Sequence, residues 1–224
     1  MMKAVVITRD QPEYVPLFEH FLRGLEHIYV VDRPTKDYPA GIPCIVNRTG
    51  HGFLAGRMRD LGALAFCGED ILFLDGDKVP LGNLRSVEES PYDCVLLGVH
   101  GDGRAYFDGT THQVKLPPIQ YQGNGCYTCG ILYRARLIEL FRRYNDGRIF
   151  HPCFDGIWGE EDTWNGDIMN YENVKVGVVA DCYLTGSIGG LTDPKLPQLA
   201  ENFLKRLSLR KRLLHNTADT IMKR

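Results

Sequence analysis

The chain has 224 residues and a mass of 25.3 kDa, which suits one large α/β domain. No stretch reaches the ~18–20 uncharged apolar residues of a membrane helix, and residues 1–10 are typical of a first strand rather than a signal peptide. The formal net charge of −2 combines an acidic body, residues 1–194 with 18 basic and 26 acidic side chains, and a basic segment, residues 195–224 with eight basic and two acidic ones.

The first half of the sequence alternates apolar runs with helical patterns. Strands are predicted at residues 4–7, 27–31, 44–47 and 71–74. Helices are predicted at residues 13–25 and 52–66, the second from apolar residues three and four positions apart. The order strand, helix, strand, strand, helix, strand is typical of a parallel sheet covered by helices.

The second half is less regular. It predicts a strand at 94–99, a hairpin at 103–116, a strand at 130–133 that leads into a helix ending near 144, a helix at 161–169 and a strand at 174–179. Pro194 and Pro197 mark the start of a basic helical extension. We therefore expect an α/β domain at residues 1–194, with a mostly parallel central sheet flanked by helices, followed by an extension at residues 195–224.

The strongest local signal is Asp75-Gly76-Asp77, which directly follows the apolar run Ile71–Leu74. Ligands of parallel sheets bind beyond the carboxyl ends of the strands, and aspartates two positions apart point to the same side. Such a pair of carboxylates suits Mg²⁺ or Mn²⁺ that shares its ligands with phosphates. An ordinary turn after a strand explains the same residues equally well.

The second signal is Trp158-Gly159-Glu160-Glu161-Asp162. Adjacent carboxylates repel one another, so this segment favours a side chain that can accept a proton as a general base. The alternative is a helix N-terminus, where acidic residues offset the helix dipole. Both interpretations can hold together.

With both signals in place, the body from about Lys3 to Gly190 resembles a GT-A glycosyltransferase of the large family-2 group, including the small enzymes of this type carried by bacteriophages. Asp75-Gly76-Asp77 matches the DxD motif of that family, and residues 158–162 match its Trp-Gly-x-Glu-Asp motif. The resemblance implies a GT-A (Rossmann-like) fold and transfer of a sugar from a nucleotide-diphosphate sugar, first of all a UDP-sugar, to a hydroxyl group, with inversion as the simplest mechanism.

The resemblance also implies a role for individual residues. Donor-binding residues would be Thr8, Arg9, Asp32, Arg57, Asp75, Gly76 and Asp77. Among them, Asp77 together with Asp75 would hold the Mn²⁺ or Mg²⁺ that bridges the diphosphate. Asp162 would be the catalytic base with Glu161 beside it, and Trp158 and Glu160 would bind the acceptor. Relatives often carry a further histidine ligand late in the domain, where this sequence has Ser187.

The acceptor and the class of transferase stay open. Seven scattered cysteines favour a reducing compartment, and we expect a cytoplasmic protein. The basic extension could bind DNA, which suggests a hydroxymethylated pyrimidine in phage DNA as acceptor, or an anionic membrane, which suggests a glycan or lipid-linked acceptor. A sugar-phosphate nucleotidyltransferase is the alternative enzyme, although the segment Thr8–Pro12 lacks the glycines usual there. A binding module without activity is the third possibility.

Overall fold

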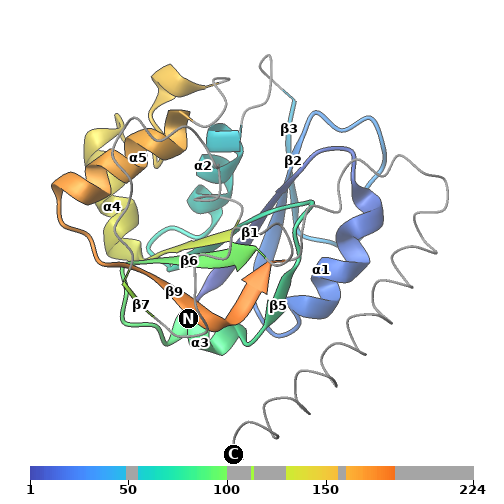
Figure 1. The fold of residues 1–224 in the computed structure, drawn as a ribbon. Coiled ribbons are helices and arrows are strands. Elements are labelled where there is room, and N and C mark those ends of the chain that lie inside the picture. Colours follow the sequence, from blue (N-terminus) through green and yellow to red (C-terminus); the bar gives the residue numbers. More distant parts are fainter. Residues whose placement is uncertain (49–54, 100–111, 114–129, 156–159, 185–224) are drawn as a thin grey trace, which may run out of the picture.

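The computed structural model describes residues 1–48, 55–99, 112–113, 130–155 and 160–184, which form one sheet covered by helices on both faces (Figure 1). The strands are β1 (Lys3–Thr8), β2 (His27–Asp32), β3 (Cys44–Asn47), β4 (Ile71–Asp75), β5 (Pro80–Gly82), β6 (Cys94–Val99), β7 (His112–Gln113), β8 (Gly130–Tyr133) and β9 (Val176–Leu184). The helices are α1 (Val15–Phe21), α2 (Ala55–Ala65), α3 (Leu84–Glu88), α4 (Ala135–Tyr144) and α5 (Glu160–Tyr171), with short 3₁₀ turns at Pro12–Tyr14 and Pro152–Phe154.

The strand order is β3-β2-β1-β4-β8-β6-β9-β5, and β7 also pairs with β9. β1, β2, β3 and β4 pair in parallel, whereas β8 lies antiparallel between β4 and β6. Because β6 is antiparallel to β8 and parallel to β9, both β6 and β9 run in the same direction as β1–β4. Six of the nine described strands therefore point their carboxyl ends the same way.

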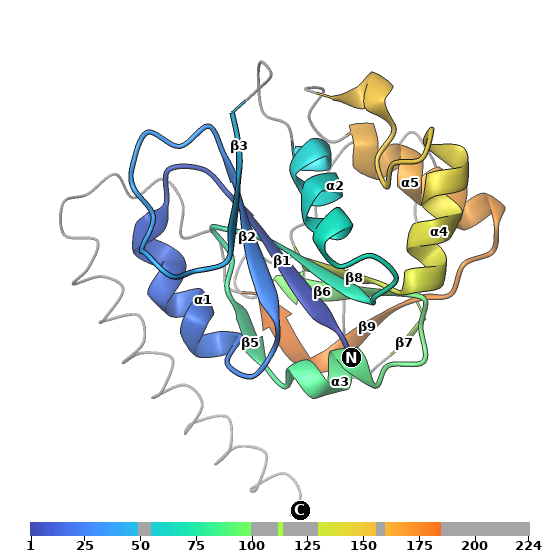
Figure 2. The ribbon, with the colours of Figure 1, turned by 180° about the vertical axis from the view of Figure 1, so that it is seen from behind.

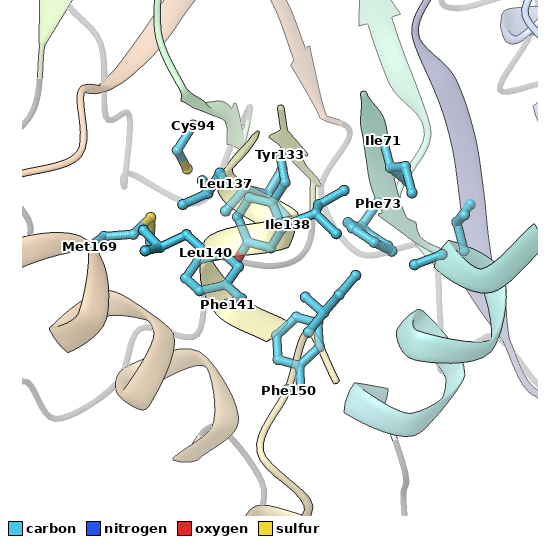
Figure 3. Packing of buried hydrophobic residues seen from close by; sticks show 14 of the residues in the cluster. Ile71, Phe73, Cys94, Tyr133, Leu137, Ile138, Leu140, Phe141, Phe150 and Met169 are labelled. Atoms are coloured by element: carbon cyan, nitrogen blue, oxygen red, sulfur yellow. The ribbon is translucent and has the colours of Figure 1, made fainter. Parts of the chain in front are cut away.

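Helices cover both faces of the sheet (Figures 1 and 2), and each face buries a separate apolar layer. On β1, Val5 and Ile7 join the layer beneath α2, α4 and α5, whereas Ala4 and Val6 join the layer beneath α1 and α3. This alternation follows from the two-residue period of a strand that is buried on both faces. Figure 3 shows the first layer, where the Tyr133 ring of β8 packs against Phe73 of β4, Phe141 of α4 and Phe150.

Most predicted elements are confirmed, with differences at their ends. The first helix is shorter than expected, because residues 12–14 form a 3₁₀ turn and α1 ends at Phe21. The sequence patterns did not indicate β5 or α3, which have only three and five residues. The two residues of β7 lie within the expected hairpin, and in the structure they pair with β9. Most of the expected hairpin and the whole basic extension lie outside the described residues. Within the described part of the chain, no helix is long and apolar enough to cross a membrane.

Buried polar side chains join the end of α4 to α5. Asn145 is fully buried, and its Nδ2 donates to the Ile149 carbonyl at 2.6 Å and to Asn165 Oδ1 at 3.0 Å. Its Oδ1 accepts from Trp164 Nε1 at 2.7 Å, and Asn165 Nδ2 donates to the same Ile149 carbonyl at 3.1 Å. These bonds anchor α5 to the end of α4 and to Ile149. Residues 160–162 form the first turn of the anchored helix.

We expect Asn145→Ala to lower the free energy of unfolding by about 2 kcal/mol, because it leaves the Trp164 and Asn165 groups buried without this partner. Urea unfolding followed by circular dichroism measures the change. Arg143→Ala, at an exposed position on the same helix, is the control and should change stability little. A loss for Asn145→Ala no larger than the control's would contradict the structural role of this network.

Candidate functional site

Four neighbouring strands, β3, β2, β1 and β4, each end in a polar residue, and their carboxyl ends lie side by side along one edge of the sheet. In the strand register Asn47 of β3 pairs with Asp32 of β2, Val31 pairs with Thr8 of β1, and Ile7 pairs with Asp75 of β4. The structure therefore brings together three residues expected to bind the donor, Thr8, Asp32 and Asp75, on three different strands.

Both carboxylate oxygens of Asp32 accept hydrogen bonds from neighbouring side chains. Asp32 is fully buried, and its Oδ1 accepts from Asn47 Nδ2 at 2.8 Å and from Arg33 Nε at 3.1 Å. Its Oδ2 accepts from Arg33 Nη2 at 2.7 Å. Arg33 has φ of 44°, in the left-handed region, and this turn folds its side chain back onto the preceding aspartate. Asp32 thus joins the ends of β2 and β3 and presents Arg33 at the edge.

A chain of hydrogen bonds closes the loop after β1. Thr8 Oγ1 donates to Gln11 Oε1 at 3.2 Å, so the 3.3 Å contact with the Tyr38 hydroxyl must have Tyr38 as donor. The Gln11 backbone N–H donates to the same hydroxyl at 3.2 Å. Burial raises the pKa of Tyr38, although the hydrogen bond that its oxygen accepts from the Gln11 N–H opposes this shift, and the phenol stays protonated at neutral pH. Arg9, the other residue expected here, is exposed to solvent.

The segment after β2 also contacts this loop. Asp10 Oδ1 accepts from the backbone N–H groups of Thr35 and, at 3.2 Å, of Lys36. Burial opposes ionisation of Asp10, but the two backbone hydrogen bonds and the nearby Arg9 lower its pKa overall. The loops that follow β1 and β2 therefore form one connected wall beside Thr8.

Asp75-Gly76-Asp77 forms a tight turn against the end of β1. The Gly76 N–H donates to the Ile7 carbonyl at 2.7 Å, and a Cβ at Gly76 would lie 2.5 Å from Thr8 Cβ. Glycine is needed here for close approach of two backbones rather than for a left-handed φ. The side chains of Asp75 and Asp77 are 25% and 24% exposed, so both carboxylates can reach a ligand at the edge.

A buried arginine that the sequence analysis did not single out holds Asp75. Arg59 of α2 is 2% exposed, and its Nη2 donates to Asp75 Oδ1 at 2.9 Å. Its guanidinium carbon lies 5.6 Å from the centre of the Phe150 ring. Arg57, which was expected to bind the donor, is partly buried two positions earlier on α2. The only sequence signal for Arg59 was a charged residue within an apolar helical pattern.

The turn has the donor chemistry that Mn²⁺ or Mg²⁺ requires. Asp75 and Asp77 offer hard carboxylate oxygens, and both retain access to solvent. Among the described residues no group of three or more His, Cys, Asp or Glu side chains could hold a metal ion. The two aspartates therefore fit a cation that takes its remaining ligands from water and phosphate, and they do not fit a cage built from this part of the chain alone.

The second motif begins α5, whose first residue is Glu160. Glu160, Glu161 and Asp162 thus occupy the N-terminal turn, as the helix-dipole interpretation expects. Trp158 lies outside the described residues, as does Ser187. A small pocket beside the Asp75-Gly76-Asp77 turn is lined by polar groups of Thr8, Gln11 and Tyr14 and by residues of β1, α1 and β2. Burial raises the pKa of Tyr14, and the negative charges of Glu13 and Asp77 raise it further.

Solved structures with a similar fold include nucleotide-handling transferases of low sequence identity. A protein assigned as a glucose-1-phosphate thymidylyltransferase from Bacillus anthracis is 10% identical, covers 89% of this chain and 95% of its own, and has a TM-score of 0.52. The inositol-1-phosphate CTP transferase from T. maritima is 11% identical with the same coverage and a TM-score of 0.51. The catalytic domain of Drosophila beta1,4-galactosyltransferase 7 is 17% identical over 80% of this chain and 65% of its own, with a TM-score of 0.48. No family model and no curated protein sequence matches the chain.

At these identities, the two likenesses with TM-scores above 0.5 show the fold alone. The chain has a Rossmann-like α/β fold with a mostly parallel central sheet flanked by helices, which confirms the predicted fold class. The roles assigned to individual residues, the metal and the acceptor stay predictions.

We expect Gly76→Ala to lower the free energy of unfolding by about 1–3 kcal/mol, because the new methyl group would overlap Thr8 and press on the Ile7 carbonyl. Thermal and urea unfolding measure this loss. Gly166→Ala is the matched control: a Cβ at Gly166 would meet nothing within 4 Å, and alanine favours the helix interior. The control should be neutral or slightly stabilising, and equal losses in both variants would refute the close approach at Gly76.

Proposed function

We propose that this chain is a metal-dependent glycosyltransferase that moves a sugar from a nucleotide-diphosphate sugar, most simply a UDP-sugar, to a hydroxyl acceptor. One observation carries the proposal: the partly exposed carboxylates of Asp75 and Asp77 lie at the carboxyl edge of a parallel sheet, on a turn packed against Thr8. Ligands of such sheets bind at this edge. The match of this turn to the DxD motif supports the same function.

The proposed donor site divides its work between charge and hydrogen bonding. Asp77 and Asp75 would hold Mn²⁺ or Mg²⁺, which when bound stabilises the negative charge on the departing nucleoside diphosphate. Thr8 and the adjoining loops would face the nucleoside, and Arg33, held by Asp32, adds a positive charge at the same edge. Arg9 and Arg57 are further candidates for contact with the diphosphate.

In this proposal, the acceptor binds near the first turn of α5. Asp162 would take the proton of the acceptor hydroxyl as it attacks the sugar, which gives direct displacement with inversion. Glu161 would support this base, and Trp158 and Glu160 would bind the acceptor. The assignment rests on the motif match and on the position of residues 160–162 in the first turn of α5.

Two acceptors are distinguished by experiment. Our proposal is a hydroxymethylated pyrimidine in DNA, because the segment at residues 195–224 is basic and a hydroxymethyl group is a primary alcohol. Transfer of labelled sugar to hydroxymethyl-containing DNA, with unmodified DNA as control, tests it at low salt. Transfer to a glycan or lipid-linked alcohol, with none to DNA, would assign the rival acceptor.

A nucleotidyltransferase is the second candidate, since the two similar structures with TM-scores above 0.5 are enzymes of that kind by name. Such an enzyme joins a sugar phosphate to a nucleoside triphosphate and releases pyrophosphate. The absence of glycine from Thr8–Pro12 favours the glycosyltransferase. Incubation with a nucleoside triphosphate and a sugar phosphate separates the two, because pyrophosphate release supports only the second candidate.

We expect UDP-sugars with Mn²⁺ to raise the melting temperature of the wild-type protein, and Asp77→Ala to abolish this shift, because binding to the folded state stabilises it. A thermal-shift screen of nucleotide sugars measures the effect, with EDTA reversing it. Glu89→Ala, an exposed carboxylate directly after α3, is the control and should retain the shift. An undiminished shift for folded Asp77→Ala would contradict its role in metal and donor binding.

For the catalytic base, we expect Asp162→Asn to lower kcat by about 10²–10⁴-fold while the donor-induced thermal shift remains. The amide keeps the size of the side chain but cannot accept the proton. Asp167→Asn, a partly buried carboxylate on the same helix, should keep kcat within a few-fold of the wild type. Near-normal turnover by Asp162→Asn would assign the base to another group.

A further inference from the structure

The Asp75-Gly76-Asp77 turn is matched by positive charge before any ligand binds. Arg59 lies against Asp75 with 2.9 Å between Nη2 and Oδ1, and Lys78 Nζ lies 3.8 Å from Asp77 Oδ1. Over these four side chains, two carboxylates meet two cations and the formal charges cancel. A divalent cation that arrives alone therefore gains little net attraction from this turn.

The Arg59–Asp75 pair cannot separate easily, because the surrounding backbone holds both partners. On one side, a Cβ at Gly62 would lie 2.3 Å from Val5 Cγ1, which shows how closely α2 packs on β1. On the other side, the Gly76 N–H bond to the Ile7 carbonyl fixes the turn that carries Asp75. Rotation of Asp75 away from Arg59 would also leave a buried guanidinium without this carboxylate, which is costly.

Asp60, the residue after Arg59, holds the segment that carries Phe150 against the Arg59 guanidinium. Asp60 accepts from Arg148 Nε at 2.6 Å and from the Ile149 N–H at 2.7 Å. These bonds hold the segment that places the Phe150 ring beside Arg59. Arg59 is thus clamped between an aromatic ring and the carboxylate that it contacts.

We propose that Arg59 is a positioning residue that serves as the internal counter-ion of Asp75. Because one Asp75 oxygen is committed to Arg59, Asp75 offers a cation its other oxygen, and most of the cation's ligands and attraction must come from the diphosphate. The cation then binds weakly by itself and tightly only with the nucleoside diphosphate. This inference rests on the proposed function, and it adds that metal and donor bind as a unit.

Binding of Mn²⁺ to the full chain tests the proposal, measured from the free Mn²⁺ signal in electron paramagnetic resonance with and without UDP. The wild type should bind Mn²⁺ much more tightly with UDP than without it. Arg59→Met removes the charge and keeps an apolar side chain beside Phe150, so it should tighten binding of Mn²⁺ alone by about tenfold through the lost repulsion. The same variant should slow sugar transfer, because Asp75 loses its fixed orientation.

The controls separate this role from a structural one. Arg143→Met makes the same charge change at an exposed site on α4 and should bind Mn²⁺ like the wild type, as should Arg59→Lys, which keeps the charge. A merely structural Arg59 would give weaker Mn²⁺ binding in Arg59→Met, the opposite sign. Should Arg59→Met fail to fold, Arg59→Gln, which can still donate to Asp75, should show the same tightening.

Two outcomes would overturn the inference. The first is a folded Arg59→Met or Arg59→Gln variant that binds Mn²⁺ alone no more tightly than the wild type. The second is a wild type that binds Mn²⁺ equally well with and without UDP, while Asp77→Ala abolishes that binding. The proposed function fails differently. It fails if no nucleoside diphosphate or nucleotide sugar binds the wild type at all, whereas the comparison of variants with Mn²⁺ alone still measures the effect of Arg59.

Discussion

The parallel pairing of β1 with β2 on one side and β4 on the other determines where each candidate donor residue lies. The register places Thr8 beside Val31 and Ile7 beside Asp75, so a polar residue that ends one strand meets the polar end of the next. Within β1, the side chains on both faces are buried in the apolar layers, and no polar side chain lies between Lys3 and Thr8. Chemistry is therefore confined to the edge, where the backbones approach closely enough to require Gly76.

Helix α2 connects this edge to the segment that precedes α5, the proposed acceptor side. Two consecutive residues of α2 make the connection: Arg59 contacts Asp75 of the proposed metal-binding turn, and Asp60 accepts hydrogen bonds from the Arg148–Phe150 segment. That segment continues through Asp155, which Arg148 holds with two bonds of 2.9 Å, toward the start of α5. A displacement of α2 would consequently act on both halves of the proposed reaction.

The sequence predicted the parts of this arrangement that leave a local pattern. Continuous apolar runs indicated β1, β2, β4, β6 and β8, because a strand buried on both faces needs such a run. The short β5 and α3 have too few residues for a period to emerge, and both form against β9. Asp75 and Asp77 could be found because they follow a strand.

Arg59 could not be found as a partner of Asp75, because the pairing joins residues 16 positions apart and depends on how α2 packs against β1. The hydrogen bonds that Asp32 accepts could not be predicted either. They depend on the fold, which directs Asn47 of β3 and Arg33, in a left-handed turn, onto the two carboxylate oxygens. In each case the missing information was the tertiary packing that selects which charged side chains meet.

The polar groups at the edge are already hydrogen-bonded to one another, and this constrains how a donor can be recognised. Asp32 is occupied by Arg33 and Asn47, and Thr8 by Gln11 and Tyr38. A nucleoside that bonds to Thr8 or Asp32 competes with these contacts, so the exchange yields little net free energy but penalises a base whose groups do not match. Affinity must then come from elsewhere, and the charge of the diphosphate is the remaining source. Arg59 and Lys78 already offset the charges of Asp75 and Asp77. In the proposed site the cation would therefore bring the positive charge that the diphosphate needs, and cation and donor would each depend on the other for tight binding.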